Sequence, residues 1–122
     1  MLTSYKELTV WQKAFELTVK IFKVTGKFPK SELYGLVSQM RRCAVSIPSN
    51  IAEGYTREHR QEYLQFLRIG FASGAELETQ LMLSKELKFL TIQEFNDTIS
   101  LLTEVQKMLN KLISSLKIGV RV

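Results

Sequence analysis

Residues 91–117 read TIQEFNDTISLLTEVQKMLNKLISSLK, and this stretch has the most regular apolar pattern of the chain. Its apolar side chains recur at spacings of three, four and seven residues, at Ile92, Phe95, Ile99, Leu102, Leu109 and Leu116. This period predicts an amphipathic helix with an apolar seam, as in coiled coils and four-helix bundles. The opening Thr91-Ile-Gln-Glu94 has the form of a capping box, which predicts that the helix begins there.

Three further helices are predicted before this one, and the alternating pattern of strands is absent. Glycines, prolines and capping residues delimit the helices, at about 9–25, 31–54, 57–89 and 91–117. Thr9-Val-Trp-Gln12 fits a second capping box, Gly26 is placed to end the first helix in a left-handed conformation, and Thr56 is placed to cap the third. Short connections make sequential helices antiparallel. The sequence therefore predicts an all-α protein, a single up-down-up-down four-helix bundle over residues 1–122.

Pro48 interrupts the predicted second helix, within Ser46-Ile-Pro-Ser-Asn-Ile-Ala-Glu-Gly-Tyr55. Proline removes a backbone N–H and crowds the preceding turn, at a cost of roughly 3 kcal/mol or more in a helix interior. We therefore expect a kink near Pro48 and a carbonyl of Ala44 without its helical donor. One side of this helix is polar and forms a candidate partner-binding surface of Arg42, Ser46, Ser49, Asn50 and Glu53. An ordinary solvent-facing side explains the same pattern.

The predicted first helix is apolar over more of its circumference than one core face requires. One stripe is aliphatic and is expected to face the core: Val10, Ala14, Leu17, Ile21 and Val24. A second stripe, about 100° further round the helix, is aromatic and consists of Trp11, Phe15 and Phe22. Exposed aromatic patches mark interfaces, so these three residues are candidates for an oligomer interface. The alternative is a bundle that buries both stripes.

The predicted third helix carries Gly70, Gly74 and Glu78 close to its apolar seam. The glycines allow another helix to approach closely. A carboxylate in such a seam is unstable unless it is paired. The sequence therefore predicts a structural ion pair between Glu78 and Arg41 of the second helix, with Lys85 as the second choice of partner.

The chain has 17 Lys plus Arg against 12 Asp plus Glu, a net charge of +5. Most of the excess lies in residues 1–30, which contain six lysines and two glutamates. A basic first helix is compatible with nucleic acid, with an acidic partner, or with a simple solvated surface.

Catalytic and metal sites are poorly supported. His59 is the only histidine and Cys43 the only cysteine, so metal-ligand pairs and nucleophile–base pairs cannot be assembled from spacing. No phosphate-binding glycine loop occurs. We therefore expect a non-enzymatic protein without metal or cofactor. The chain also lacks an apolar leader or a membrane-length apolar run, which predicts a cytoplasmic protein.

Three segments carry a family resemblance in combination: Ser46–Tyr55, Leu8-Thr-Val-Trp-Gln-Lys-Ala14 and Glu76-Leu-Glu-Thr-Gln-Leu81. With them the chain resembles the bacterial four-helix bundle family of proteins encoded in 23S rRNA intervening sequences. Members are similar in fold to the accessory variability proteins of diversity-generating retroelements, which bind a reverse transcriptase and nucleic acid. The resemblance implies a ring-like homo-oligomer, a pentamer, with a basic surface. It implies no defined activity.

Two functional hypotheses follow. The first is a homo-oligomeric bundle that binds structured RNA or a ribonucleoprotein through basic helix faces. Its candidate phosphate contacts are Lys13, Lys20, Lys23, Lys27, Arg57, Arg60 and Arg68. The second is a protein-interaction scaffold or accessory subunit with no direct role in RNA binding, whose partner docks on the polar stripe of the second helix.

Overall fold

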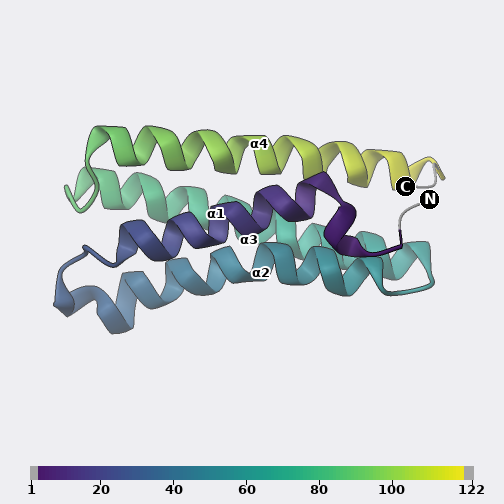
Figure 1. The fold of residues 1–122 in the computed structure, drawn as a ribbon, viewed down its shortest axis with the longest axis horizontal. Coiled ribbons are helices and arrows are strands. Elements are labelled where there is room, and N and C mark those ends of the chain that lie inside the picture. Colours follow the sequence, from purple (N-terminus) through teal and green to yellow (C-terminus); the bar gives the residue numbers. More distant parts are fainter. Residues whose placement is uncertain (1–2, 120–122) are drawn as a thin grey trace.

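The computed structural model describes residues 3–119 and shows four long helices packed side by side (Figure 1). They are α1 (Thr9–Thr25), α2 (Ser38–Tyr55), α3 (Arg60–Glu86) and α4 (Ile92–Lys117), and no strand occurs in the described part of the chain. Successive helices run in opposite directions, and both α1 and α3 pack against α2 and α4. The all-α bundle predicted from the sequence is confirmed. Among the described helices, none combines the length and the apolar composition that a membrane crossing requires.

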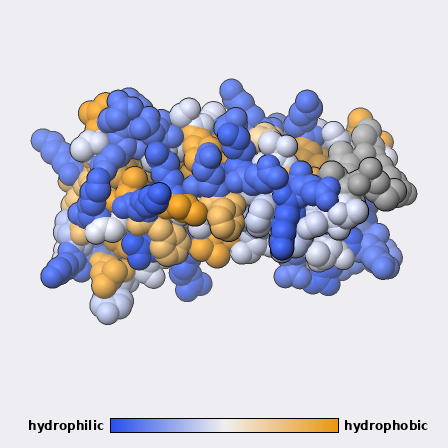
Figure 2. Space-filling view, in the orientation of Figure 1, coloured by the Kyte–Doolittle hydropathy of each residue, from blue (hydrophilic) through white to orange (hydrophobic). Residues whose placement is uncertain are grey.

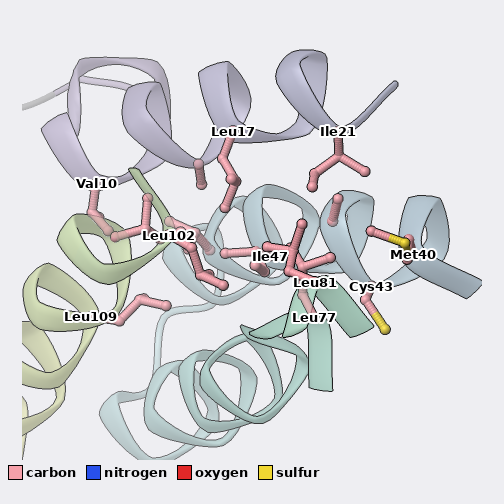
Figure 3. Packing of buried hydrophobic residues seen from close by; sticks show 14 of the residues in the cluster. Val10, Leu17, Ile21, Met40, Cys43, Ile47, Leu77, Leu81, Leu102 and Leu109 are labelled. Atoms are coloured by element: carbon pink, nitrogen blue, oxygen red, sulfur yellow. The ribbon is translucent and has the colours of Figure 1, made fainter. Parts of the chain in front are cut away.

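The core lies along the bundle axis and receives one apolar stripe from each helix (Figure 3). The aliphatic stripe of α1 is buried as predicted, with Leu17 and Ile21 completely inaccessible. They belong to one core cluster with side chains of the other three helices, among them Met40, Ile47, Leu77, Leu81, Leu102 and Leu109. Each fully buried leucine or isoleucine contributes roughly 1.5–3 kcal/mol. These contacts fix which side of every helix remains outside.

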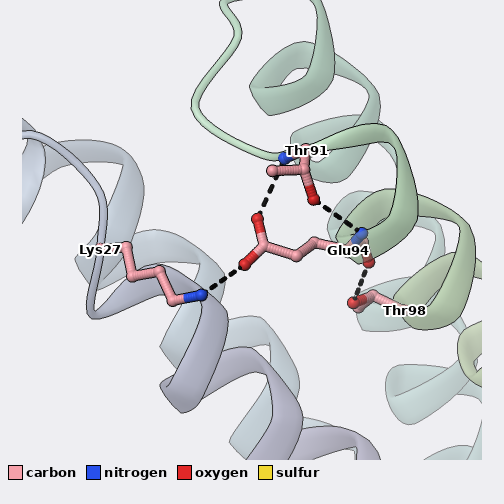
Figure 4. A network of polar contacts seen from close by, with 4 residues as sticks. All are labelled: Lys27, Thr91, Glu94 and Thr98. Atoms are coloured by element: carbon pink, nitrogen blue, oxygen red, sulfur yellow. Dashed lines mark hydrogen bonds and ion pairs between the residues drawn. The ribbon is translucent and has the colours of Figure 1, made fainter.

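The start of α4 forms as the sequence predicts (Figure 4). The Thr91 hydroxyl accepts a hydrogen bond from the Glu94 amide at 3.1 Å, and the Thr91 amide donates to the Glu94 carboxylate at 3.0 Å. Lys27 reaches the other carboxylate oxygen of Glu94 at 2.7 Å. The capping box thereby also ties the end of α1 to the start of α4.

The capping box predicted at Thr9 does not form. A short 3-10 helix, η1 (Tyr5–Glu7), precedes α1, and Leu8 occupies the cap position without a side-chain hydrogen bond. The Gln12 side chain instead donates to the carbonyl of Lys6 at 2.8 Å. The Gln12 side chain thus ties α1 to the preceding turn and does not cap the amides of the first turn.

Two other predicted helix caps are wrong, although α1 ends at Thr25 as expected. Gly26 has φ −62°, which is right-handed, so no left-handed glycine ends α1. The third helix begins at Arg60 rather than after Thr56, whose hydroxyl donates back to the carbonyl of Glu53 at 2.8 Å. The same helix ends at Glu86, where Lys88 adopts φ 63° and makes the turn into α4.

Irregular backbone precedes α2. A 3-10 helix, η2 (Lys30–Glu32), leads into a π-helical segment, η3 (Leu33–Val37), within which Gly35 has non-helical torsions of φ −114° and ψ −105°. The break turns Leu33 and Tyr34 outward, 44% and 92% exposed. From Ser38 onward α2 continues as one helix through Pro48. The kink at Pro48 stays a prediction, and the break in helical torsions lies at Gly35.

Candidate interaction surfaces

A groove of about 690 Å³ runs between α1 and α2 on the surface of the bundle. We call it the α1–α2 groove; its lining is mainly apolar and includes Trp11, Phe15, Val19, Phe22, Val45, Pro48 and Ala52. Phe15 is 52% exposed and Phe22 42% exposed, so the bundle does not bury the aromatic stripe. Figure 2 shows hydrophobic residues gathered on this face among hydrophilic ones. Two of the three predicted interface residues are therefore available to another molecule, and Trp11 is half-buried beside them.

The floor of this groove is fixed by a contact across the two helices. The Thr18 hydroxyl lies 2.9 Å from the carbonyl oxygen of Ala14 and 3.0 Å from that of Ala44. Pro48 is the residue whose missing N–H leaves the Ala44 carbonyl without its helical donor. The Thr18 hydroxyl of α1 therefore supplies a donor for the Ala44 carbonyl of α2, which was predicted to lack one.

The polar stripe of α2 is divided between inner and outer contacts. Ser46 shares a hydrogen bond of 2.8 Å with Ser73 of α3, and the Asn50 amide donates to the Ser46 carbonyl at 2.7 Å. Glu53 pairs with Arg57 at 3.2 Å. Arg42 and Ser49 remain exposed, beside Phe22 in a shallow groove. Ser46 thus contributes to the α2–α3 packing, and the partner-binding role of the stripe stays a prediction.

The lysines of α1 face carboxylates of α4. Lys13 lies 3.7 Å from Glu104, and Lys27 lies 2.7 Å from Glu94. The hydrogen bond from Lys27, followed by that from the Thr91 backbone, lowers the pKa of Glu94 below its usual value. Lys20 and Lys23 line a groove whose three lysines are matched by three carboxylates, those of Glu16, Asp97 and Glu104. This side of the bundle is electrostatically mixed rather than basic.

The three arginines predicted to contact phosphate lie elsewhere. Arg57 pairs with Glu53 and Glu62 at 3.2 and 3.7 Å and stacks on the ring of Phe66. Arg60 and Arg68 are exposed on α3, and neither makes an ion pair within residues 3–119. Lys27 and Arg57 lie near opposite ends of the bundle (Figure 1). The seven predicted cations therefore do not form one patch.

The predicted ion pair between Arg41 and Glu78 does not form, and Glu78 is exposed. Arg41 donates instead to the Thr25 hydroxyl at 3.0 Å and to the Phe22 carbonyl at 3.3 Å. These partners belong to the last turn of α1, where the helix dipole favours a cation. Lys85, the second choice of partner, lies over the ring of Phe95.

The family model of the 23S rRNA-intervening sequence proteins matches residues 6–111. The chain belongs to this family. A solved structure with a similar fold is that of a protein of unknown function from the S23 ribosomal protein family of Bacteroides thetaiotaomicron. The TM-score is 0.79 at 24% sequence identity, over 86% of this chain and 95% of the other. None of the curated proteins matches the chain.

Nothing in this family member resembles a prepared catalytic centre among residues 3–119. Burial, followed by the neighbouring Glu76 carboxylate, raises the pKa of the Cys43 thiol to about 11, so the thiol is protonated at neutral pH. His59 is exposed at the cap position of α3. No group of three or more metal-ligating side chains occurs in this part of the chain.

Sequence reasoning missed two inter-helix contacts, those of Thr18 and Gln106. The Gln106 side chain lies over Gly74 and donates to the Phe71 carbonyl at 2.9 Å. The signal for Thr18 was present, because Pro48 leaves a carbonyl without its donor and a hydroxyl beside the core stripe of α1 can supply one. Gln106 gave a weaker signal, as a polar residue within an apolar seam.

Proposed function

We propose that this protein is a non-catalytic cytoplasmic bundle that assembles with copies of itself through the α1–α2 groove and binds structured RNA. The observation that carries the proposal is the exposed aromatic stripe of α1. Complete burial of a side chain of this size contributes roughly 1.5–3 kcal/mol, and a monomer forgoes the part that belongs to the exposed area. A groove between two antiparallel helices also has the shape that accepts another helix.

The chain itself offers an apolar surface to fill this groove. Exposed apolar side chains gather at the end of the bundle that holds both the α1–α2 and the α3–α4 connections: Leu33, Tyr34, Leu83 and Leu87. A contact between two different surfaces of identical subunits is heterologous, and it generates a ring when the rotation closes. This arrangement agrees with the pentameric ring that the family resemblance implies.

Light scattering on the purified protein tests assembly. We expect an oligomer at micromolar concentration and a monomer for Phe15→Ser combined with Phe22→Ser. The matched control is Ile69→Ser, because Ile69 is also exposed, at 46%, but lies on α3 outside the groove. Helix content measured by circular dichroism should be unchanged in both variants. A monomeric wild-type protein would overturn self-assembly and assign the groove to a different protein partner.

The RNA part is supported by the net charge of +5. Binding that depends on phosphate contacts weakens linearly on a log–log plot against salt, by about 0.9 per contact for duplex DNA. We therefore expect a fluorescently labelled hairpin from 23S rRNA to bind at low salt, with a steep loss of affinity as salt rises. Absence of binding at low salt would overturn this part and favour the protein-interaction scaffold.

A further inference from the structure

The two halves of α4 differ in charge. Its first half carries Glu94, Asp97 and Glu104, whereas residues 105–119 contain three lysines, Lys107, Lys111 and Lys117, and no carboxylate. The neighbouring part of α3 has the same character, since residues 63–75 contain Arg68 and no carboxylate. A cation near the C-terminus of a helix stabilises its dipole, but that effect is confined to the last turn. It accounts for Lys117 and leaves Lys107 and Lys111 unexplained.

Packing brings these cations onto one side of the bundle. Lys107 and Phe71 line the same groove of about 350 Å³ between α3 and α4, and Arg68 precedes Phe71 by one turn. At the end of α4, the Arg60 guanidinium lies 2.9 Å from the position that a Cβ on Gly119 would occupy. We define the α3–α4 basic face as these exposed side chains of both helices: Arg60, Arg68, Lys107, Lys111 and Lys117.

The α3–α4 basic face is not neutralised from within the chain. None of its five residues makes an ion pair in the described range 3–119. One carboxylate, that of Glu78, lines the groove of Lys107. On the α1 side, by contrast, the groove of Lys13, Lys20 and Lys23 also contains the carboxylates of Glu16, Asp97 and Glu104, and Lys13 pairs with Glu104. Residues 63–75 and 105–119, which pack beside each other, therefore carry four cations and no carboxylate.

Building on the proposed RNA binding, we propose that the α3–α4 basic face, and not the lysines of α1, holds the RNA phosphates. The aromatic side chain of this region, Phe71, is half-buried, so the face has no exposed ring on which an unpaired base would stack. Phosphate contacts alone suit the backbone of structured RNA. The face also lies on the opposite side of the bundle from the α1–α2 groove, because α1 and α3 both pack between α2 and α4. Assembly through that groove leaves it accessible.

Charge reversal tests the assignment, with a labelled RNA hairpin followed by fluorescence anisotropy across a salt series. We expect Lys107→Glu combined with Lys111→Glu to weaken binding roughly tenfold or more and to lower the salt slope by about two. Lys107→Gln combined with Lys111→Gln should have a smaller effect in the same direction. The control is Lys30→Glu combined with Lys88→Glu, which changes the net charge equally at the far end of the bundle. It should stay within about twofold of wild type, because distant charges are screened by salt.

The alternatives give different outcomes. If Lys20→Glu with Lys23→Glu abolishes binding while the α4 variant binds normally, the α3–α4 assignment is overturned and the proposed function stands. If the wild-type protein binds no hairpin at low salt, the proposed function itself fails. Polyglutamate is the competitor for an acidic protein partner. Displacement of the hairpin by polyglutamate at equal charge concentration would overturn the assignment to RNA.

Discussion

Two seams of the bundle are each crossed by a side chain that donates to a carbonyl of the neighbouring helix. Between α1 and α2, Thr18 lies 3.0 Å from the carbonyl oxygen of Ala44. Between α3 and α4, Gln106 donates to the carbonyl oxygen of Phe71 at 2.9 Å. The distances are nearly equal, but the acceptors differ. The Ala44 carbonyl has no helical donor, because residue 48 is a proline and lacks an N–H. The Phe71 carbonyl lies inside α3, where the amide of Ala75 is its helical donor.

Two hydrogen bonds of nearly equal length can therefore contribute differently to the free energy of unfolding. A hydrogen bond that satisfies an otherwise unpaired buried group prevents a desolvation cost of about 1–3 kcal/mol. A second bond to a carbonyl that already has a donor contributes only its small net value. Gln106 also keeps a buried side-chain oxygen without a partner, which reduces its contribution further. We therefore expect the α1–α2 contact to be the more important of the two for stability.

Thr18→Val tests the larger effect. The substitution keeps the shape of the side chain but leaves the Ala44 carbonyl without a donor, so it should lower the free energy of unfolding by about 1–3 kcal/mol. Chemical denaturation of the wild type and the variant measures the loss. Pro48→Ala supplies the control, because it restores a backbone N–H to α2. In that background Thr18→Val should cost much less, and equal losses in both backgrounds would show that Thr18 does not compensate for Pro48.

Gln106→Met tests the weaker contact and should change the free energy of unfolding by less than about 1 kcal/mol, since it removes a buried polar group together with its bond. A substitution at Gly74 tests the same contact from the other helix. A methyl group there would displace the Gln106 side chain, so Gly74→Ala should gain little while Gln106 is present. Combined with Gln106→Ala, the same change should stabilise α3 by up to about 1 kcal/mol, the difference between glycine and alanine in a helix. Denaturation of the four proteins of this cycle measures the coupling, and additive effects would contradict it.

Glu94→Gln addresses a third, exposed contact between helices and should have the smallest effect. Glutamine retains the capping box but loses the ion pair with Lys27, a loss of about 0.2–1 kcal/mol at neutral pH. Because the folded state lowers the pKa of Glu94, the charged side chain stabilises the fold above the usual value of 4.5 and loses this effect as the pH falls below it. Thermal unfolding between pH 7 and pH 3 should therefore show the two proteins converging in acid. A constant difference would exclude the charge as its cause.

The fold could be predicted from the sequence where one local signal decides the structure. The Thr91 capping box involves groups three residues apart, and it forms as expected. The aliphatic stripe of α1 also follows from helical periodicity alone. Gly35 could not be foreseen, because helical periodicity assumes unbroken torsions, whereas the torsions of Gly35 are not helical.

The candidate site was less predictable, because its residues depend on the rotation and register of neighbouring helices. A helical wheel placed Glu78 in the seam, but α3 turns it outward into the groove beside α4. Arg41 instead donates to the Thr25 hydroxyl and the Phe22 carbonyl at the end of α1, which no pairing by charge would suggest. The α1 lysines looked unopposed in the sequence because Glu94 and Glu104 lie more than 60 residues away along the chain. Only packing brings these groups together.

The link from Thr18 to Ala44 makes the two helices depend on each other during folding. An isolated α2 would carry a defect in its middle, where a helix without tertiary contacts is already marginal. Docking of α1 removes that defect, so the two helices should form and open as one cooperative unit. Because α1 precedes α2 in the chain, Thr18 is synthesised before Ala44, whose carbonyl accepts its hydrogen bond. The first helical pair can therefore close during synthesis, before α3 and α4 have emerged.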